Sequence, residues 1–480
     1  MRQSVLAIVG AVALLFAGQP SWAEDESDAA ALVQTARRET GLTVERLTGE
    51  LTRTTGQLRA FAGIVETHQD RDPILDVPTS ELPAQVDIRR STVALGPVAV
   101  WPASNFPLAF GVAGGDTASA LAAGCPVVVK AHPSHPATSN RCAAAVLAAL
   151  HETGTAVGWF SVLHAHSVSP GIALTAHPGV QAIAFTGSEA GGRALFNAAA
   201  ARPVPIPVFA ELGSINPMVI TPAAIAERGA AIAAELAGSL VGSTGQLCTK
   251  PGLVLLVDGP QTEEFIAELS QALPSERAGV MLNSRLHDGF VTQARESAAL
   301  AGVTSPVPPM SDLGERQGQR AVLIRTGSRT YRASAQLQRE HFGPFAVIIT
   351  CTDVDDLLDV LAGQVGSLTG TIHAGSAEPE LARRIIVALA RFAGRIVYNG
   401  FPTGVAVGWA TVHGGPYPAT TAAATTSVGM TAVNRFQRPI ALQGVPDDLL
   451  PPELQDANPL GLVRRLNGRL TDAVVSRHLG

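Results

Sequence analysis

The stretch that decides the fold is Val98–Lys130, VAVWPASNFPLAFGVAGGDTASALAAGCPVVVK. It begins with an apolar run at 98–101 and ends with a second one at 126–130. The alanine-rich segment between them predicts a helix over 107–123, with Pro107 in its first turn. Two short buried strands joined by a helical crossover are typical of a parallel sheet.

The same alternation continues along the chain. Residues 27–65 carry apolar side chains every three to four positions and predict helix, whereas 84–97 predict extended chain. The later predicted helices are 137–151, 223–240, 262–273, 354–363 and 379–392, and the later predicted strands are 158–165, 180–185, 205–212, 252–257, 344–350, 368–374 and 394–400. The fold class is therefore α/β, with two units whose parallel sheets are covered on both faces. The first unit suits a doubly wound nucleotide fold, although the chain has no GxGxxG.

Composition limits the class of ligand. The 480 residues are 46% apolar and 15% charged, and the net charge of −6 is spread without long blocks of one sign. This composition argues against a nucleic-acid groove and favours small-molecule ligands. The four cysteines are far apart and form no CxxC or Cys/His pattern, so neither a disulfide framework nor a zinc site is predicted. His132 and His135 in HPSHP are separated by prolines that rule out a helical face, and we predict no metal site there.

The N-terminus is typical of a secretory signal. Arg2 is followed by an apolar run at 5–17 and then by GQPSWAEDE, with small residues at 21 and 23. The run is too short to span a bilayer. A buried N-terminal helix and a misassigned start are the alternative interpretations.

Three residues are candidates for chemistry. Cys248 lies in the tight segment GQLCTKPG, where a cysteine is either a small buried hydrophobe or a nucleophile. Glu211 ends an apolar strand and is either a solvated carboxylate or a partly desolvated general base. Asn105 follows the first strand and is either a turn residue or an amide donor to an oxyanion. Residues 186–188, TGS, end a strand and open a helix, which is an arrangement that can bind phosphate.

Lysine is rare in this chain. The only two lysines among 34 basic residues are Lys130, at the end of an apolar run, and Lys250, two positions after Cys248. A compact ammonium at Lys250 would lower the thiol pKa or attract a substrate carboxylate if it faced the cysteine, and would do neither if it pointed away.

Seven motifs in order, ASNFPLAF, GCPVVVKAHP, AFTGS, AELGSINP, GQLCT, EHFGPF and GPYPATT, resemble the aldehyde dehydrogenase superfamily. The similarity covers roughly residues 30–470, and NGFPTGVAV together with the C-terminal LLPPELQDANPLGLVRRLNGRL resembles its 2-oxoglutarate semialdehyde (2,5-dioxopentanoate) dehydrogenase branch, which is related to NADP-dependent fatty aldehyde dehydrogenases. That branch usually has asparagine where this chain has Lys250. The family also carries further strands and helices ahead of the helix that begins near Ala30, where this chain has the signal-like segment.

The resemblance implies roles for the three candidates. Cys248 would attack the aldehyde carbon, and the Asn105 side chain with the Cys248 backbone N–H would hold the oxyanion. Glu211 would activate the water that hydrolyses the thioester. The expected reaction is oxidation of an aldehyde to a carboxylic acid with NAD(P), most specifically of 2,5-dioxopentanoate to 2-oxoglutarate.

The resemblance also implies a cofactor site. Its residues would be Lys130, Gly187, Ser188, Glu340 and Phe342. In NAD-preferring relatives an acidic residue three positions beyond the lysine binds the ribose 2′-hydroxyl, and here that position is Pro133. Because no carboxylate would repel a 2′-phosphate, NADP is the expected cofactor, with NAD as the alternative.

The expected architecture is aldehyde dehydrogenase-like. It consists of a signal-like segment at 1–23, a Rossmann-type nucleotide-binding domain at 24–240 with oligomerisation strands near 84–97, a second α/β catalytic domain at 241–430, and a return and oligomerisation tail at 431–480. A homo-oligomer, dimer or tetramer, is expected through segment 86–95, with no nucleic-acid partner and no integral membrane segment. Export follows from the signal, whereas the family's usual location is the cytoplasm. Two other hypotheses stay open, an inactive exported relative that only binds ligand and a cysteine-dependent esterase.

Overall fold

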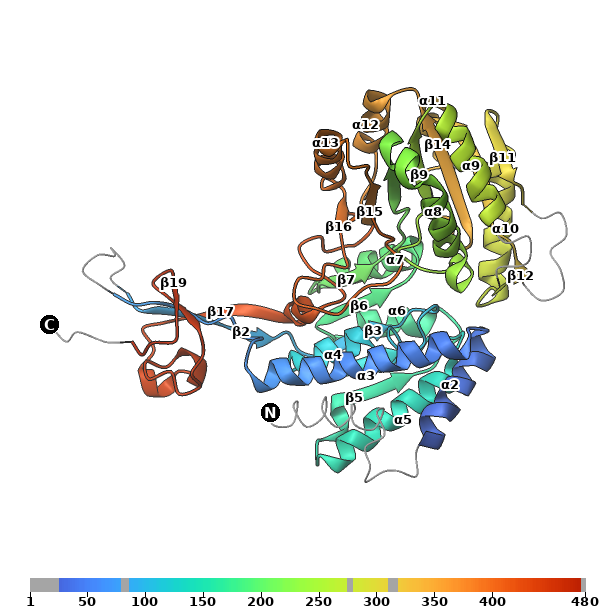
Figure 1. Ribbon diagram of the computed structural model, residues 1–480. Helices are drawn as coiled ribbons and strands as arrows, with labels where there is room; N and C mark the ends of the chain where they lie inside the picture. The colour runs from blue at the N-terminus through green and yellow to red at the C-terminus, as the bar shows by residue number, and fades with distance from the viewer. Residues whose placement is uncertain (1–25, 79–85, 274–278, 310–317, 476–480) are drawn as a thin grey trace.

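The structure is a computed structural model that describes residues 26–78, 86–273, 279–309 and 318–475. The signal-like segment predicted at 1–23 lies outside these ranges. Two α/β units lie one above the other, and a thin arm of strands projects from them (Figure 1). Within the described ranges, no helix is both long enough and apolar enough to cross a bilayer.

The first unit is built on a five-stranded sheet in which every pair is parallel, in the order β5-β4-β3-β6-β7. Its strands are β3 (Val98–Trp101), β4 (Val127–Lys130), β5 (Phe160–Leu163), β6 (Ala182–Thr186) and β7 (Val208–Glu211). The chain runs outward from β3 in both directions, so the carboxyl ends of β3, β4, β6 and β7 meet at one edge. Open sheets of this kind bind ligands at that edge.

Helices cover this sheet on both faces. They are α2 (Glu26–Thr40), α3 (Val44–Glu66), α4 (Gly115–Ala122), α5 (Pro136–Glu152), α6 (Ser169–Ala176) and α7 (Glu189–Ala200). The helical pattern predicted over 27–65 is confirmed, but it breaks into α2 and α3 at Gly41, whose φ of +70° favours glycine. The apolar faces of α2 to α5 pack with β3 and β4 into one buried core.

The helix predicted to begin at Pro107 is wrong over its first half. Helix α4 begins only at Gly115, and residues 107–114 form turns. The amides of Leu108 and Ala109 donate to the Glu50 carboxylate of α3, at 2.8 and 2.9 Å, instead of entering a helix. A Cβ on Gly111 would lie 2.0 Å from a backbone oxygen of the same turn, so the turn depends on that glycine.

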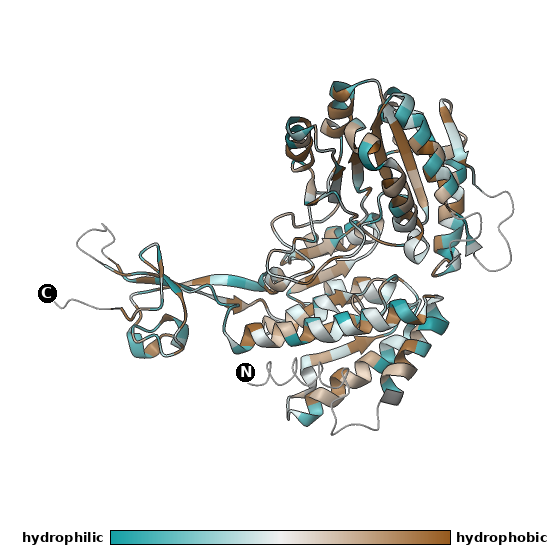
Figure 2. Cartoon of the chain, in the orientation of Figure 1, coloured by the Kyte–Doolittle hydropathy of each residue, from teal (hydrophilic) through white to brown (hydrophobic). Residues whose placement is uncertain are grey.

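The second unit is a seven-stranded sheet in the order β11-β13-β14-β9-β8-β15-β16. Its strands are β8 (Pro217–Ile220), β9 (Leu253–Val257), β11 (Val303–Val307), β13 (Val322–Gly327), β14 (Phe345–Cys351), β15 (Ser367–His373) and β16 (Ala393–Tyr398), and only the edge strand β11 is antiparallel to its neighbour. Its helices are α8 (Pro222–Val241), α9 (Pro260–Ala272), α10 (Ser284–Ala298), α11 (Ser328–Ala333), α12 (Val354–Ala362) and α13 (Pro379–Leu389). Strand β14 is hydrophobic along its length, whereas the helices outside it carry mixed surfaces (Figure 2).

The chain passes from the first sheet to the second between Glu211, which ends β7, and Pro217, which begins β8. This crossing places the end of β7 beside the loop that leads into β9. The sequence analysis did not predict β8, α6, α10 or β13. A short two-stranded ribbon, β10 (Gly279–Val280) with β12 (Gly318–Gln319), lies beside α10.

The arm is a five-stranded sheet in the order β17-β2-β1-β18-β19. Its strands are β1 (Ile74–Asp76), β2 (Ile88–Ala94), β17 (Gln437–Gln443), β18 (Arg464–Leu466) and β19 (Arg469–Thr471). The extended chain predicted over 84–97 is thus confirmed over β2. However, β2 already has a neighbour on each side, so a strand from another subunit cannot add to it, and the free edges belong to β17 and β19.

Candidate active site

The loop from residue 242 to 252 carries Cys248 between the end of α8 and the start of β9. It turns at Gly245, whose φ is +65°. A Cβ on Gly245 would lie 2.3 Å from the carbonyl carbon of Gly343. The path of the loop therefore requires glycine at this position, both for the backbone angle and for the close approach.

Asn216 anchors this loop from the adjoining chain crossing. Its Nδ2 donates to the carbonyl oxygens of Cys248, at 2.8 Å, and Lys250, at 3.0 Å. Its Oδ1 accepts from the amide and the hydroxyl of Thr369, at 3.2 and 3.0 Å, and from the Ser214 hydroxyl, at 2.7 Å. One buried amide thus joins the loop to β15 and to the end of the first sheet.

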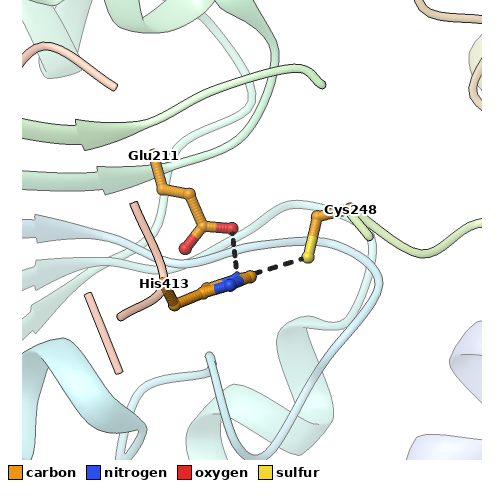
Figure 3. Close-up of side chains that lie close together, drawn as sticks. All are labelled: Glu211, Cys248 and His413. Carbon is orange, nitrogen blue, oxygen red and sulfur yellow. Dashed lines mark hydrogen bonds and ion pairs between the residues drawn. The ribbon is translucent and has the colours of Figure 1, made fainter. Parts of the chain in front are cut away.

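Three titratable side chains, of Glu211, Cys248 and His413, converge at the end of β7 (Figure 3). The Cys248 Sγ lies 3.5 Å from Nε2 of His413, and the same nitrogen lies 2.9 Å from Oε1 of Glu211. Glu211 and His413 are buried, while Cys248 is partly exposed. The Ser427 hydroxyl donates to the second oxygen of Glu211 and fixes the carboxylate.

The electrostatics of these groups are coupled. Burial alone would raise the pKa of Glu211, but the His413 imidazole and the Ser427 hydroxyl together hold that pKa below its usual value. Burial and the Glu211 carboxylate raise the pKa of the Cys248 thiol well above its ordinary value, against the opposing effect of Arg53. The resting cysteine is therefore a thiol with a carboxylate and an imidazole within reach of its proton.

His413 was not among the residues that the sequence analysis selected. It lies in the Pro- and Gly-rich stretch that follows β16, two residues ahead of the quoted motif GPYPATT. That stretch returns to the first sheet, where Thr421 bonds to the backbone of β7, and the His413 amide donates to the Thr426 hydroxyl at 2.8 Å. The sequence HGGP in this loop is the one local pattern that could have drawn attention to His413.

Asn105 lies beside the cysteine loop. Its Nδ2 donates to the carbonyl of Gln246 at 2.9 Å, two residues before Cys248. An amide nitrogen carries two hydrogens, so one remains for a further acceptor. The structure thus brings Asn105, Glu211 and Cys248 to one place at the carboxyl edge of the first sheet.

A pocket of about 290 Å³ opens onto Cys248 and His413. Two arginines of α3, Arg46 and Arg53, line it together with Phe106 and Phe110. The Arg46 guanidinium lies 4.3 Å from the ring centre of Phe106, and that of Arg53 lies 5.3 Å from the ring centre of Phe110. The sequence analysis named neither arginine. Which face of α3 meets the pocket depends on how the helix packs against the first sheet, and the sequence of the helix does not show this.

Lys250 does not face the pocket. Its side chain is buried, and its Nζ donates to the carbonyl of Phe345 at 2.6 Å. Burial lowers the pKa of Lys250 to about 8, against the effect of Glu340. Burial raises the pKa of Glu340 to about 7, while Lys250 opposes the rise. Of the two possibilities left open for Lys250, the structure favours the one in which it points away from the thiol.

The residues expected at the cofactor lie at two places. Lys130 ends β4, and Gly187 and Ser188 lead into α7, all at the carboxyl edge of the first sheet. Glu340 and Phe342 come from the second unit, and the Glu340 carboxylate lies against Gly213, where a Cβ would approach its Oε2 to 2.6 Å. The two places flank the end of β7.

These residues fit a dinucleotide. Within the described ranges, the half-buried Lys130 ammonium has no hydrogen-bond or ion-pair partner, so it is free to bind a ribose hydroxyl or phosphate. At the same edge, the N-terminus of α7 can bind a phosphate. Gly187 forms the turn into this helix, and a Cβ there would lie 2.7 Å from the Phe185 ring.

A doubly wound sheet with a cysteine, a carboxylate and an imidazole at its carboxyl edge is typical of a nucleotide-dependent enzyme that uses a thiol. Comparison with known proteins agrees with this class. Residues 24–304 match the aldehyde dehydrogenase family. The chain belongs to this family and is an NAD(P)-dependent enzyme that oxidises aldehydes to carboxylic acids.

Two relatives cover nearly the same span. The chain is 47% identical over 441 residues to alpha-ketoglutaric semialdehyde dehydrogenase 2 of Azospirillum brasilense, and this match covers 92% of the chain and 84% of the relative. It is 40% identical over 450 residues to alpha-ketoglutaric semialdehyde dehydrogenase of Acinetobacter baylyi, with the same coverage of 92% and 84%. A solved structure of betaine aldehyde dehydrogenase from Staphylococcus aureus has the same fold, with a TM-score of 0.76 at 18% identity over 92% of this chain and 83% of the other.

Proposed function

We propose that this enzyme oxidises 2-oxoglutarate semialdehyde (2,5-dioxopentanoate) to 2-oxoglutarate, with Cys248 as the nucleophile. Two relatives named for this substrate support the proposal, at 47% and 40% identity. The observation that carries it in this chain is the charge of the pocket at Cys248. The substrate has an aldehyde at one end and a carboxylate at the other, and a pocket that holds both ends needs a cation away from the thiol.

Arg53 is the cation best placed for that carboxylate. Its Nε is buried without a hydrogen-bond partner among the described residues. Burial lowers its pKa, which shows that the charged form lacks full solvation in this pocket. The nearby Glu50 offsets this burial only in part, because one Glu50 oxygen accepts two backbone amides and the other faces Arg46 at 3.5 Å. An entering carboxylate would supply the missing partner.

Arg46 supports the same end of the pocket. Its Nη2 donates to the backbone carbonyl of Asn105 at 3.2 Å, so it also fixes the segment that carries the Asn105 amide. The phenyl rings of Phe106 and Phe110 flank both guanidinium groups and suit the carbon chain of a small substrate. We infer that the arginines orient the substrate with its aldehyde towards Cys248.

The residues then divide the chemistry among them. The thiol proton passes to the Glu211–His413 pair as the Cys248 sulfur bonds to the aldehyde carbon. The free Nδ2 hydrogen of Asn105 and the Cys248 backbone N–H stabilise the resulting oxyanion. Lys130, Ser188 and Glu340 would hold the nicotinamide cofactor, which would supply a hydride acceptor for that carbon. The pair then releases the thiol proton to solvent. Glu211 next takes a proton from water as the water oxygen bonds to the thioester carbon, and when the carbon–sulfur bond breaks that proton passes to the sulfur, so that the acid leaves and the thiol is restored.

We infer that NADP is the preferred cofactor. Pro133 stands where an acidic residue would repel a 2′-phosphate, and the Lys130 ammonium nearby has no protein partner among the described residues to compete for it. The kcat/KM values with the two cofactors test this. A higher or comparable value for NADP supports the inference, and strict use of NAD contradicts it.

We also infer a homo-oligomer that assembles through the arm. The free edge of β17 and exposed apolar side chains on the arm support this. Those side chains are Ile88, Leu449, Val463 and Leu470. Light scattering on the purified protein should give a dimer or tetramer mass, and a monomer at micromolar concentration would contradict the inference.

A substrate pair tests the proposed function. Initial rates are measured with 2,5-dioxopentanoate and with pentanal, a neutral aldehyde of the same length, for the parent protein and for Arg53→Gln. Loss of a charge-assisted bond should raise KM for the dioxo acid about tenfold or more and change KM for pentanal less than about threefold. Arg59→Gln is the matched control, because Arg59 lies on the same helix with an exposed side chain.

The outcomes separate the alternatives. No oxidation of either aldehyde by the parent protein would contradict the proposal. If Arg53→Gln changed the KM for both aldehydes equally, Arg53 would not be the residue that recognises the substrate carboxylate. Ester hydrolysis without cofactor reduction, lost in Cys248→Ala, would instead indicate the esterase.

A further inference from the structure

We propose that Glu211, Cys248 and His413 form an inhibitory binding site for one zinc-class divalent cation. Their ligand atoms, a carboxylate oxygen, a thiol sulfur and an imidazole nitrogen, all lie within 4.8 Å of one another. The proposal concerns the residues given catalytic roles above, but it does not depend on which aldehyde the enzyme oxidises.

The distances suit tetrahedral zinc. A zinc ion with sulfur at ~2.3 Å and nitrogen at ~2.0 Å holds these two atoms roughly 3.5 Å apart. The observed separation of Cys248 Sγ and His413 Nε2 is 3.5 Å. The Nε2 to Oε1 separation of His413 and Glu211 is 2.9 Å, which has to widen by about 0.4 Å to match two ligands at ~2.0 Å.

The three ligand atoms contact one another, and a bound cation would replace these contacts. Glu211 is 3% exposed, and its Oε1 has no aligned hydrogen-bond donor in the described part of the chain. Its contact with His413 therefore leaves a lone pair that a cation can use. The three side chains point towards one another from β7, from the cysteine loop and from the returning loop after β16 (Figure 3).

Charge and access favour the same class of ion. A thiolate and a carboxylate bring two negative charges, which one divalent cation neutralises in a buried place. Thiolate and imidazole favour zinc, cadmium or cobalt over magnesium and calcium. The pocket of about 290 Å³ that reaches Cys248 and His413 gives the ion its route and leaves room for a water at the fourth position.

Binding would stop the reaction reversibly. The cation forms a bond to the Cys248 sulfur, and the thiol proton is released to solvent. The sulfur lone pair that attacks the aldehyde is then engaged, and the Glu211 carboxylate no longer activates water. No electrons are transferred, so removal of the ion by a chelator restores the thiol.

Cobalt is the direct probe of this site. The full chain, freed of thiol reagents and chelators, is titrated with Co²⁺ alone. We expect one equivalent to produce a near-ultraviolet thiolate-to-cobalt charge-transfer band, which Zn²⁺ displaces and Mg²⁺ does not. A spectrum without that band, or a band that persists in Cys248→Ser, would overturn the proposal.

Alkylation gives a second measurement on the unaltered protein. Saturating Zn²⁺ should slow iodoacetamide labelling of Cys248 about tenfold or more, and a chelator should restore the rate. Unchanged labelling would overturn the proposal. Neither readout involves an aldehyde, so zinc binding and the proposed oxidation can fail independently.

Two ligand variants complete the test. Glu211→Gln and His413→Gln should each weaken Zn²⁺ binding about tenfold or more, since each removes one ligand. His164→Gln, at an exposed histidine, should leave the affinity unchanged. Equal affinities for all of these variants and the parent would place the ion elsewhere and contradict the proposed site.

Discussion

Replacement of Lys250 by methionine should change how the stability of the protein depends on pH. The Lys250 ammonium is buried beside Glu340, and its pKa is lowered to about 8 from 10.5. A downward shift of this size means that folding the charged side chain costs about 3 kcal/mol at neutral pH. Methionine has a similar length and no charge, so Lys250→Met removes that cost.

The sign of the effect follows from proton binding. Below pH 8 lysine is protonated in both the folded and the unfolded chain, and the cost is present in full. Between pH 8 and 10.5 the unfolded chain holds a proton that the folded chain lacks, so the stability of the parent rises with pH. The rise is about 1.4 kcal/mol per pH unit, or about 2 kcal/mol from pH 8 to 9.5.

Urea unfolding followed by tryptophan fluorescence measures this difference. Across pH 8 to 9.5 the parent should gain about 2 kcal/mol relative to Lys250→Met. Arg59→Gln, at an exposed position that does not titrate in this range, should keep the slope of the parent. Parallel stability curves for the parent and Lys250→Met would refute the reasoning, because they would mean that Lys250 binds its proton equally in both states.

The same variant has a consequence for the cofactor. Lys250 opposes the rise in the pKa of Glu340, which stands at about 7. We propose that Glu340 accepts hydrogen bonds from the ribose beside the nicotinamide; without the ammonium it should be protonated at neutral pH and be a weaker acceptor for them. The KM for NADP should rise several-fold at pH 7, while the KM for the aldehyde stays within about twofold.

Three further changes test the supports of the site. Gly245→Ala should destabilise the protein by about 3 kcal/mol or more in urea unfolding, because its Cβ would lie 2.3 Å from backbone. Gly56→Ala is the control and should be neutral or stabilising, because a Cβ there has no neighbour within 4 Å. Asn216→Ala should cost about 2–4 kcal/mol and lower kcat about a hundredfold, because two carbonyls of the loop that carries the proposed nucleophile lose their donor. From pH 6.5 to 5 the parent should lose about 2 kcal/mol more than His341→Gln, because burial lowers the pKa of His341 to about 4 and only the unfolded chain gains the proton there. His164→Gln, at an exposed site, should show the full loss of the parent.

The order of elements was predictable from the sequence where apolar runs are continuous. Strands β3, β4, β6 and β7 were all predicted, because each is a short buried run between turn residues. The helix from Pro107 was wrong because the amides of that segment bond to Glu50, which lies 58 residues away from Leu108. Local propensity does not carry that information.

The site itself was only partly predictable. Asn105, Glu211 and Cys248 stand out because each follows a strand or lies in a tight loop. His413 reaches Cys248 across 165 residues of chain, through a loop that has no periodic pattern. Arg46 and Arg53 belong to a helix that was predicted, but the orientation of their face depends on how α3 packs against the first sheet.

The Asn216 anchor has a consequence for how this enzyme can evolve. Asn216 binds the carbonyls of positions 248 and 250, which every amino acid has, and makes no demand on their side chains. These two anchors of the loop that carries Cys248 are therefore independent of the side chain at position 250, which adds a separate bond to the Phe345 carbonyl. A substitution at position 250 can therefore change the charge beside Glu340 without removing either carbonyl bond that holds the loop.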